Sequence, residues 1–311
     1  SDGCSSDLSK SKIYLPLLVL GTAFWGISFP LSKDAFDSIH PYTFMFYRFL
    51  IATFILALIF YKQIPKINSE TIRKGAIAGL FLFMGICWQT VGLKYTSSSN
   101  ASFIAGVEVV LIPLFAFLFM KRSIQTRMWV ACLLALAGLY IIAMASGFSD
   151  FRIGDLMVFV GSLFYSVYIL YVGKISTDLR SEVTAIPFVI IQLSVCALLA
   201  GALTVSTQGV GAVSMSLPFD VWKALLFVAI LSTAYMYCIQ NAAQKYIEAE
   251  KIALTYLCEP IFATVFAYII LNEEITSRTV IGGTLILSAM LLAEVNVMAV
   301  YRRIRAFCTV N

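Results

Sequence analysis

Charge is scarce in this sequence. Charged residues make up 13% of its 311 residues and apolar residues make up 60%, whereas an ordinary soluble domain has roughly 25% charged residues. A chain of this composition cannot cover itself with polar side chains, so we expect a lipid bilayer to surround it. The formal net charge of +5 is modest, and we expect no nucleic-acid partner.

Histidine and closely spaced cysteines are also scarce. His40 is the one histidine, so neither a histidine-based metal site nor a Ser/His/Asp relay can be built without it. The seven cysteines show no C-x-x-C spacing, and most lie inside apolar runs, where a thiol behaves as a small hydrophobe. The motifs H-E-x-x-H, G-x-S-x-G and G-x-x-x-x-G-K-[ST] are missing. We therefore expect no metal, no cofactor, no catalytic residues and no ATP-driven pump; the protein is not predicted to be an enzyme.

Apolar runs dominate what is present. Crossing a bilayer as a helix takes roughly 17–25 predominantly apolar residues, and ten stretches qualify: 13–33, 41–61, 74–94, 100–120, 127–147, 153–174, 183–205, 222–243, 251–271 and 278–300. The links between them are too short to hold a soluble domain. Prolines at positions 30, 113, 187 and 260 interrupt four of these stretches and can bend them.

Lysine and arginine are distributed unevenly along the chain. Sixteen of the 22 lie in the N-terminal segment, in the links that follow the even-numbered spans, and in the C-terminal tail, whereas the opposite links hold five. Positively charged links stay on the cytoplasmic side. We therefore predict a multi-pass membrane protein in which segment 1–12 and the basic tail 301–311 are both cytoplasmic.

One stretch of the chain recurs. Shifting 89–127 by 151 positions, without a gap, superimposes Gln89 on Gln240, Lys94 on Lys245, Tyr95 on Tyr246, Glu108 on Glu259 and Arg127 on Arg278. Each half holds five spans, an odd number, so the second half enters the membrane upside down. Inverted repeats are typical of secondary transporters, which bind their substrates near the midplane. We predict an all-α integral membrane fold of ten transmembrane helices in two inverted five-helix repeats, 13–147 and 153–300.

Several motifs resemble those of a known family. The runs C-E-P-I-F-A-T-V-F-A-Y-I-I-L-N-E-E-I-T (258–276) and I-G-G-T-L-I-L-S-A-M-L-L (281–292) resemble the second half of EamA-type proteins of the drug/metabolite transporter superfamily. The runs F-W-G-I-S-F-P (24–30), F-Y-R-F-L (46–50) and G-L-K-Y-T-S-S-S-N-A-S-F-I (92–104) are similar to the first half. The resemblance covers about residues 12–300. It implies ten helices in two inverted repeats, a central cavity lined by spans 1, 3, 4, 6, 8 and 9, a location in the bacterial inner membrane, and export more often than uptake. Members move amino acids, sugars, cofactors, nucleosides and toxic amphiphiles, so the substrate stays open.

Two carboxylates lie in the middle of predicted spans. An ionised acid at the centre of a membrane helix costs on the order of 3 kcal/mol, so a basic partner or protonation must offset the charge of Glu108 and of Glu259. The functional interpretation is recognition of a substrate amine or coupling to protons. The alternative is a hydrogen bond that ties one span to its neighbour. We favour Glu259, because Glu259-Pro260 matches the E-P pattern of the resembled family, whereas Val109 follows Glu108.

Aromatic and polar residues share helix faces with these acids. Trp25 and Ser28 lie on one stripe of the first span, Tyr165 and Tyr168 on one stripe of the sixth, and Tyr256 on the stripe of Glu259. Such stripes fit a cavity better than a lipid face; core packing is the alternative. Gln89 and Gln240 suit a cavity wall or an interhelical hydrogen bond. The predicted substrate site is Trp25, Ser28, Gln89, Glu108, Tyr165, Tyr168, Gln240, Tyr256 and Glu259. Arg48, inside the second span, is expected to form a structural salt bridge or to snorkel to the interface.

Together these features predict a secondary transporter. It would move a small organic metabolite, such as an amino acid or a similar amphiphilic solute, by alternating access, with export the expected direction and protons a candidate coupling ion. An uptake carrier for a nucleoside-like or cofactor-like metabolite, or a lipid scramblase or flippase, is the alternative. A monomer or a homodimer is expected.

Overall fold

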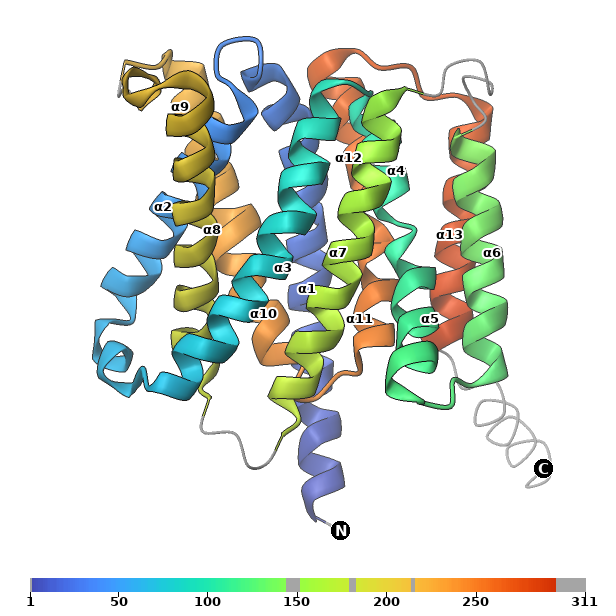
Figure 1. Ribbon diagram of the computed structural model, residues 1–311. Helices are drawn as coiled ribbons and strands as arrows, with labels where there is room; N and C mark the ends of the chain where they lie inside the picture. The colour runs from blue at the N-terminus through green and yellow to red at the C-terminus, as the bar shows by residue number, and fades with distance from the viewer. Residues whose placement is uncertain (1, 144–151, 179–182, 214–215, 295–311) are drawn as a thin grey trace, which may run out of the picture.

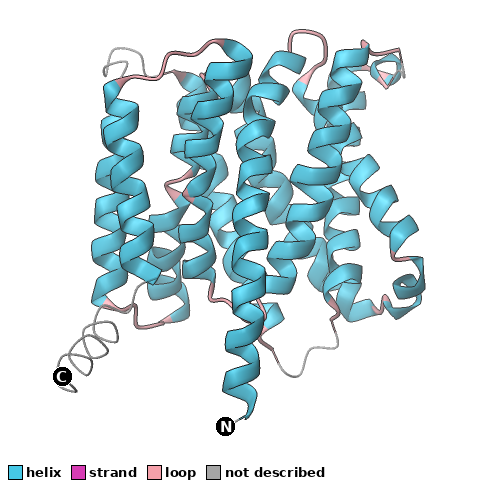
Figure 2. Cartoon of the chain, turned by 180° about the vertical axis from the view of Figure 1, so that it is seen from behind, coloured by secondary structure: helices cyan, strands magenta, loops and turns pink. Residues whose placement is uncertain are grey.

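The computed structural model describes residues 2–143, 152–178, 183–213 and 216–294, and within these ranges every regular element is a helix. Figure 2 shows the described chain as helices joined by loops. Eight segments are long and apolar enough to cross a membrane, and two shorter apolar helices, Thr126–Gly138 and Val280–Ala289, fall within the fifth and tenth predicted spans. The far ends of those two spans and the tail 301–311 lie outside the described residues. The protein is therefore a multi-pass helical membrane protein, and ten crossings stay a prediction.

The helices form one bundle and run along a common direction (Figure 1). The end at which the N-terminus lies, at the bottom of Figure 1, is called the lower end below, and the opposite end the upper end. The elements are α1 (Asp2–Ala35), α2 (Pro41–Ile59), η1 (Tyr61–Lys66), α3 (Ser69–Lys94), α4 (Ser98–Ala105), α5 (Glu108–Met120), α6 (Thr126–Ala143), α7 (Ile153–Ser176), α8 (Ala185–Gln208), η3 (Val210–Ala212), α9 (Phe219–Phe227), the π-helix η4 (Val228–Tyr235), α10 (Met236–Ala243), α11 (Ala249–Tyr256), α12 (Cys258–Leu271) and α13 (Ser277–Glu294).

Local sequence sets where individual helices begin. The side chain of Asn68 accepts a hydrogen bond from the backbone N–H of Thr71 at 2.8 Å and so caps α3. Ser97 caps α4 in the same way, by accepting from the N–H of Asn100 at 3.0 Å. Each cap satisfies a backbone donor that has no partner within its own helix.

Glycines let neighbouring helices approach closely. A Cβ atom placed on Gly92 of α3 would lie 2.7 Å from the carbonyl oxygen of Gly154 in α7, and one on Gly154 would lie 2.5 Å from the carbonyl oxygen of Gly92. A Cβ atom on Gly79 would lie 2.7 Å from the carbonyl oxygen of Gln192 in α8. Small residues at helix contacts bring backbones together in membrane proteins, and here they pack α3 against both α7 and α8.

Large apolar side chains cover the perimeter of the bundle. Phe54 of α2, Phe119 of α5 and Leu198 of α8 are 66%, 75% and 72% exposed. A soluble protein of this size rarely exposes so many large apolar side chains together. Lipid is the solvent that fits this surface.

Two of the membrane-length segments are broken near their middles. The segment Ser98–Met120 consists of α4 and α5, with a break at Gly106 and Val107, and the segment Ala249–Leu271 consists of α11 and α12, with a break at Leu257. The breaks place Glu108 and Glu259 in the first turns of α5 and α12. Positions 106 and 257 differ by 151, the shift that relates the two halves of the sequence.

The far ends of α5 and α12 also match at this shift. Lys121 and Asn272 both adopt a left-handed backbone conformation with φ of 53°. The next residue then donates its backbone N–H to a carbonyl six positions back: Arg122 to Ala116 at 3.3 Å, and Glu273 to Ala267 at 3.2 Å. A residue in the left-handed conformation is a common way to end a helix, and here it turns the following N–H back onto the last turn of the helix. α5 ends at the lower end of the bundle and α12 at the upper end (Figure 1), so Arg122 and Glu273 follow these helices at opposite ends.

Candidate functional site

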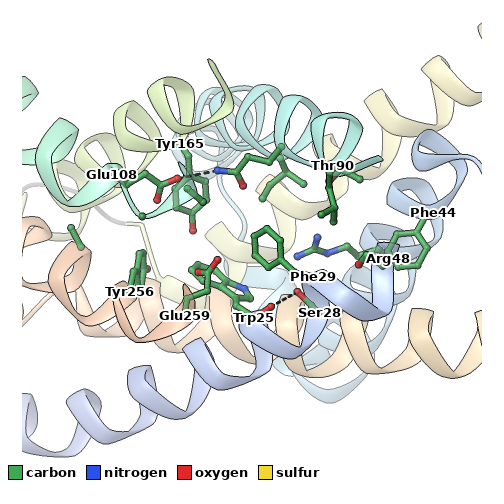
Figure 3. A pocket seen from close by; sticks show the side chains of 17 residues that line it. Trp25, Ser28, Phe29, Phe44, Arg48, Thr90, Glu108, Tyr165, Tyr256 and Glu259 are labelled. Atoms are coloured by element: carbon green, nitrogen blue, oxygen red, sulfur yellow. Dashed lines mark hydrogen bonds between the residues drawn. The ribbon is translucent and has the colours of Figure 1, made fainter. Parts of the chain in front are cut away.

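A cavity lies inside the bundle, between α1, α2, α3, the α4–α5 segment, α7 and the α11–α12 segment. Its empty space, counted together with open solvent at its mouth, is about 770 Å³. Its walls are formed by Trp25, Ser28, Phe29, Ser32, Phe44, Arg48, Ile86, Gln89, Thr90, Leu93, Ala105, Gly106, Glu108, Tyr165, Ala253, Tyr256 and Glu259 (Figure 3). Ser32, Phe44 and Leu93 belong to the upper-end turns of α1, α2 and α3, so the cavity extends from the middle of the bundle toward the upper end.

The structure brings seven of the nine predicted site residues to this cavity. Those on its wall are Trp25, Ser28, Gln89, Glu108, Tyr165, Tyr256 and Glu259. Tyr168 and Gln240 are completely buried on the lower-end side of the cavity and are not part of its wall. Their contact with a substrate stays a prediction.

The two acids of the cavity have different surroundings. Glu108, 6% exposed, accepts a hydrogen bond from the Nε2 of Gln89 at 3.0 Å, so α5 is tied to α3. Glu259, 8% exposed, makes no hydrogen bond and no close ion pair with any described residue. Figure 3 shows both carboxylates at the cavity, from opposite walls. Glu259 is thus the acid whose charge the described protein leaves without a direct partner.

Glu259 lies between Trp25 and Tyr256 in the view of the cavity wall in Figure 3. The rings of Trp25 and Tyr256 lie 4.9 Å apart in an edge-to-face arrangement, and those of Trp25 and Tyr165 lie 6.1 Å apart. The indole N–H of Trp25 donates to the carbonyl oxygen of Ser232 at 2.6 Å, which fixes the orientation of the ring. Such rings attract cations through their faces. The geometry therefore combines a carboxylate with aromatic groups that favour a positive charge.

A chain of hydrogen bonds closes the cavity on its lower side. The hydroxyl of Tyr165 donates to the Oε1 of Gln240 at 3.1 Å, and the Nε2 of Gln240 donates to the hydroxyl of Tyr168 at 3.3 Å. The amide of Asn241 also reaches the hydroxyl of Tyr168, at 3.4 Å. One turn further down, Gln244 lines a second hollow at the lower end. A polar column thus runs from the floor of the cavity toward the lower end.

Arg48 is a cavity residue that the sequence analysis did not include in the site. Its side chain is 8% exposed, so it does not snorkel to the interface. Its Nε donates to the hydroxyl of Thr233 at 2.6 Å, within the π-helix η4. In the described chain it forms no salt bridge with Glu108 or Glu259, contrary to the expected structural ion pair. Its position inside a span was the available signal, because a buried charge in a membrane segment marks a functional site by default.

Charged side chains hold the bundle at both ends. At the upper end, the carboxylate of Glu273 accepts from the backbone N–H groups of Ser98 and Ser99, at 3.2 and 3.4 Å, and from the hydroxyl of Ser99 at 2.5 Å. It thereby caps α4 from across the bundle. At the lower end, Arg122 lies 3.9 Å from the buried carboxylate of Glu250 in α11. Positions 99 and 250 again differ by 151.

Comparisons with known proteins agree with this architecture. The model of the EamA-like transporter family matches residues 12–144 and 152–294. An uncharacterized transporter of Archaeoglobus fulgidus is 31% identical over 287 residues, which are 92% of this chain and 87% of that protein. The uncharacterized transporter YvbV of Bacillus subtilis is 26% identical over 295 residues, 92% of each chain. A protein of known crystal structure shares the fold, with a TM-score of 0.68 and 17% identity over 95% of this chain and 99% of the other.

Proposed function

The chain belongs to the EamA-like transporter family, and from this premise we propose that it is a secondary transporter that works by alternating access. The proposed cargo is a small organic metabolite, an amino acid or a similar amphiphilic solute, and the proposed direction is export. The observation that carries the proposal is the cavity inside the bundle, in which Glu259 lies unpaired beside aromatic rings. Burying an acid in a membrane segment costs free energy, and such a residue therefore marks a functional site by default.

Matching breaks and caps support two inverted repeats, 13–147 and 153–300. The breaks at 106–107 and 257, the left-handed residues Lys121 and Asn272, and the contacts at positions 99 and 250 all recur at one shift of 151. The family model also matches the two halves separately. Repeats of this kind let a transporter expose one central site to each side in turn, because each half can adopt the conformation of the other.

The lower end is proposed to face the cytoplasm of a bacterium, with both termini there. The uneven distribution of lysine and arginine supports this orientation. The cavity then extends toward the outside, and the polar column of Tyr165, Gln240 and Tyr168 separates it from the cytoplasm. A fluorescent reporter that matures only in the cytoplasm, fused to the N-terminus, tests the orientation. The fusion should fluoresce, and a fusion that is expressed normally but does not fluoresce would contradict the orientation.

Flux measured in proteoliposomes tests the site. Glu259→Gln, Trp25→Ala and Tyr168→Ala should each lower flux by roughly ten-fold or more, since each removes a polar or ring contact on the path. Glu274→Gln and Tyr268→Ala are matched controls, because both side chains are exposed and lie outside the cavity. Wild-type flux from all three site variants would refute the assignment of the cavity.

Proton coupling is proposed to act through Glu259. A carboxylate without a direct partner can take up a proton on one side of the membrane and release it on the other. An imposed pH gradient should therefore drive solute accumulation in proteoliposomes, and Glu259→Gln should remove this response. If solute flux does not change with the pH gradient, proton coupling is refuted, and the protein is a uniporter or is coupled to another ion.

A lipid scramblase has less support. An apolar groove lined by Met84, Trp88, Met157, Leu199 and other residues lies between the outer faces of α3 and α8. It shares no lining residue with the central cavity, because the two use different faces of α3. A scramblase needs a polar path that opens sideways to lipid, and the described cavity does not continue into this groove.

A further inference from the structure

The guanidinium of Arg48 is held by a neutral hydroxyl and forms no salt bridge with a described carboxylate. Its Nε donates to the hydroxyl of Thr233, which in turn donates to the carbonyl oxygen of Val228 at 2.8 Å within the π-helix. Its carbon lies 5.5 Å from the centre of the Phe49 ring. The two terminal nitrogens have no hydrogen bond and no close carboxylate among the described residues. Because an uncompensated buried charge is strongly unfavourable, this fixed cation is suited to bind an anion.

The opposite wall of the cavity carries the complementary charge. Glu259 is equally buried, has no close partner, and lies beside the Trp25 and Tyr256 rings. In Figure 3 the guanidinium of Arg48 points toward Phe29, and the carboxylates of Glu108 and Glu259 lie on the other side of that ring. Arg48 and Glu259 thus line one cavity from different elements, yet they do not form a salt bridge with each other.

We propose that the cavity binds a zwitterion, with the carboxylate of the substrate at Arg48 and its ammonium group at Glu259. This rests on the proposed transport function and narrows its substrate class. A simple organic cation leaves Arg48 without an anion, and a simple organic anion leaves Glu259 without a cation. Either ligand therefore forms only one of the two possible charge-assisted contacts. An α-amino acid and a quaternary betaine share the required chemistry. The rings at the Glu259 end accept both kinds of ammonium group.

Binding to the purified full-length protein tests the charge pattern. Each of the twenty L-amino acids and glycine betaine is added in a thermal-shift assay, in which a ligand stabilises by mass action. The amino acid that binds most tightly is then compared with its amide, which lacks the carboxylate, and with its deaminated acid, which lacks the amine. Glycine betaine is compared with choline. The zwitterion should bind roughly ten- to a hundred-fold more tightly than either single-charge analogue, since each analogue loses one charge-assisted contact.

Variants assign the two ends of the ligand. Arg48→Gln should abolish the preference for the amino acid over its amide, and Glu259→Gln should abolish the preference for the amino acid over its deaminated acid. Arg73→Gln, which removes an exposed arginine outside the cavity, is the matched control and should keep both preferences. If Arg48→Gln does not fold, the comparison of amino acid and amide on the wild-type protein still decides the question.

Several results would overturn the proposal. An amide or a deaminated acid that binds as tightly as the zwitterion would do so, and so would an unchanged preference in Arg48→Gln. Transport of a cationic dye or a nucleoside, with no binding of any zwitterion in the panel, would refute the substrate class and leave the transporter intact. No flux of any of these solutes would instead count against the proposed function itself.

Discussion

Gly26 is the position at which helix packing and the candidate site depend most directly on each other. It lies on α1 opposite the first turns of α12. A Cβ atom added there would be 2.5 Å from the Cβ of Phe262, 2.7 Å from the backbone nitrogen of Ala263 and 3.0 Å from the carbonyl oxygen of Glu259. Ordinary contact begins at 3.4 Å, so α1 and α12 would have to separate by about 1 Å. Backbone atoms cannot yield as a flexible side chain can.

Two opposing free-energy terms decide the sign of Gly26→Ala. Alanine is favoured over glycine in a helix interior by about 1 kcal/mol. Overpacking a well-filled contact costs about 1–3 kcal/mol. We expect the second term to dominate, with a net loss of stability of up to ~2 kcal/mol. Because the displaced turn carries Glu259, flux should fall as well.

Gly283→Ala is the matched control for this substitution. Gly283 is also helical, on α13, but a Cβ atom added there meets nothing within 4 Å. This variant should keep the helix-propensity gain and should unfold at the same or a higher temperature than the wild type. Thermal unfolding in detergent and flux in proteoliposomes are the two measurements. If Gly26→Ala matched Gly283→Ala in both, the close packing of α1 on α12 would not constrain the site.

The remaining predictions concern the upper end. Glu273→Ala removes the carboxylate that caps α4 and should cost about 1 kcal/mol of stability. Glu274→Ala, at an exposed neighbouring position, is the control and should lower the unfolding midpoint much less. Equal effects of the two substitutions would contradict the cap. Burial, and then the nearby charge of Lys94, lower the pKa of His40 below its ordinary value of 6.5. The folded state therefore favours neutral His40, and its stabilising contribution is present above pH 6.5 and lost as the pH falls through the lower folded-state pKa. His40→Asn should flatten this part of the stability profile in unfolding curves recorded from about pH 7.5 to 5, and an unchanged slope would contradict the assignment.

The membrane segments were predictable from hydropathy, whereas the positions of the breaks within them were predictable only in part. Apolar composition marks a stretch as buried in lipid whatever its detailed backbone path. Proline was the available signal for a bend, yet Pro113 lies inside α5 and the break falls earlier, at Gly106 and Val107. At the second break the proline signal was close, because Pro260 lies three residues after Leu257 and has no N–H to donate to the carbonyl of Tyr256.

The sequence predicted which helix faces line the candidate site, but not how far along the bundle the site extends. Helical periodicity correctly grouped Trp25, Tyr165 and Tyr256 with the acids, because these positions point toward the same axis. Periodicity repeats along the whole helix, so it also selected Tyr168 and Gln240, which lie on the lower side of the cavity floor. Arg48 was missed because a lone arginine in a span has many potential partners. Only the three-dimensional arrangement shows that Thr233 anchors it and that no described acid forms a salt bridge with it.

The two caps that end α5 and α12 make the ends of the bundle respond differently to ionic strength. At the upper end, Glu273 is held by hydrogen bonds to the first backbone N–H groups of α4. At the lower end, Arg122 meets Glu250 through an ion pair at 3.9 Å, and the arginine side chain is 41% exposed. The exposed arginine of this pair is open to dissolved ions, whereas the buried carboxylate is screened much less. Rising salt should therefore weaken the lower-end contact somewhat more than the upper-end hydrogen bonds, so the ionic strength of the buffer is a variable to hold constant when the two ends are compared.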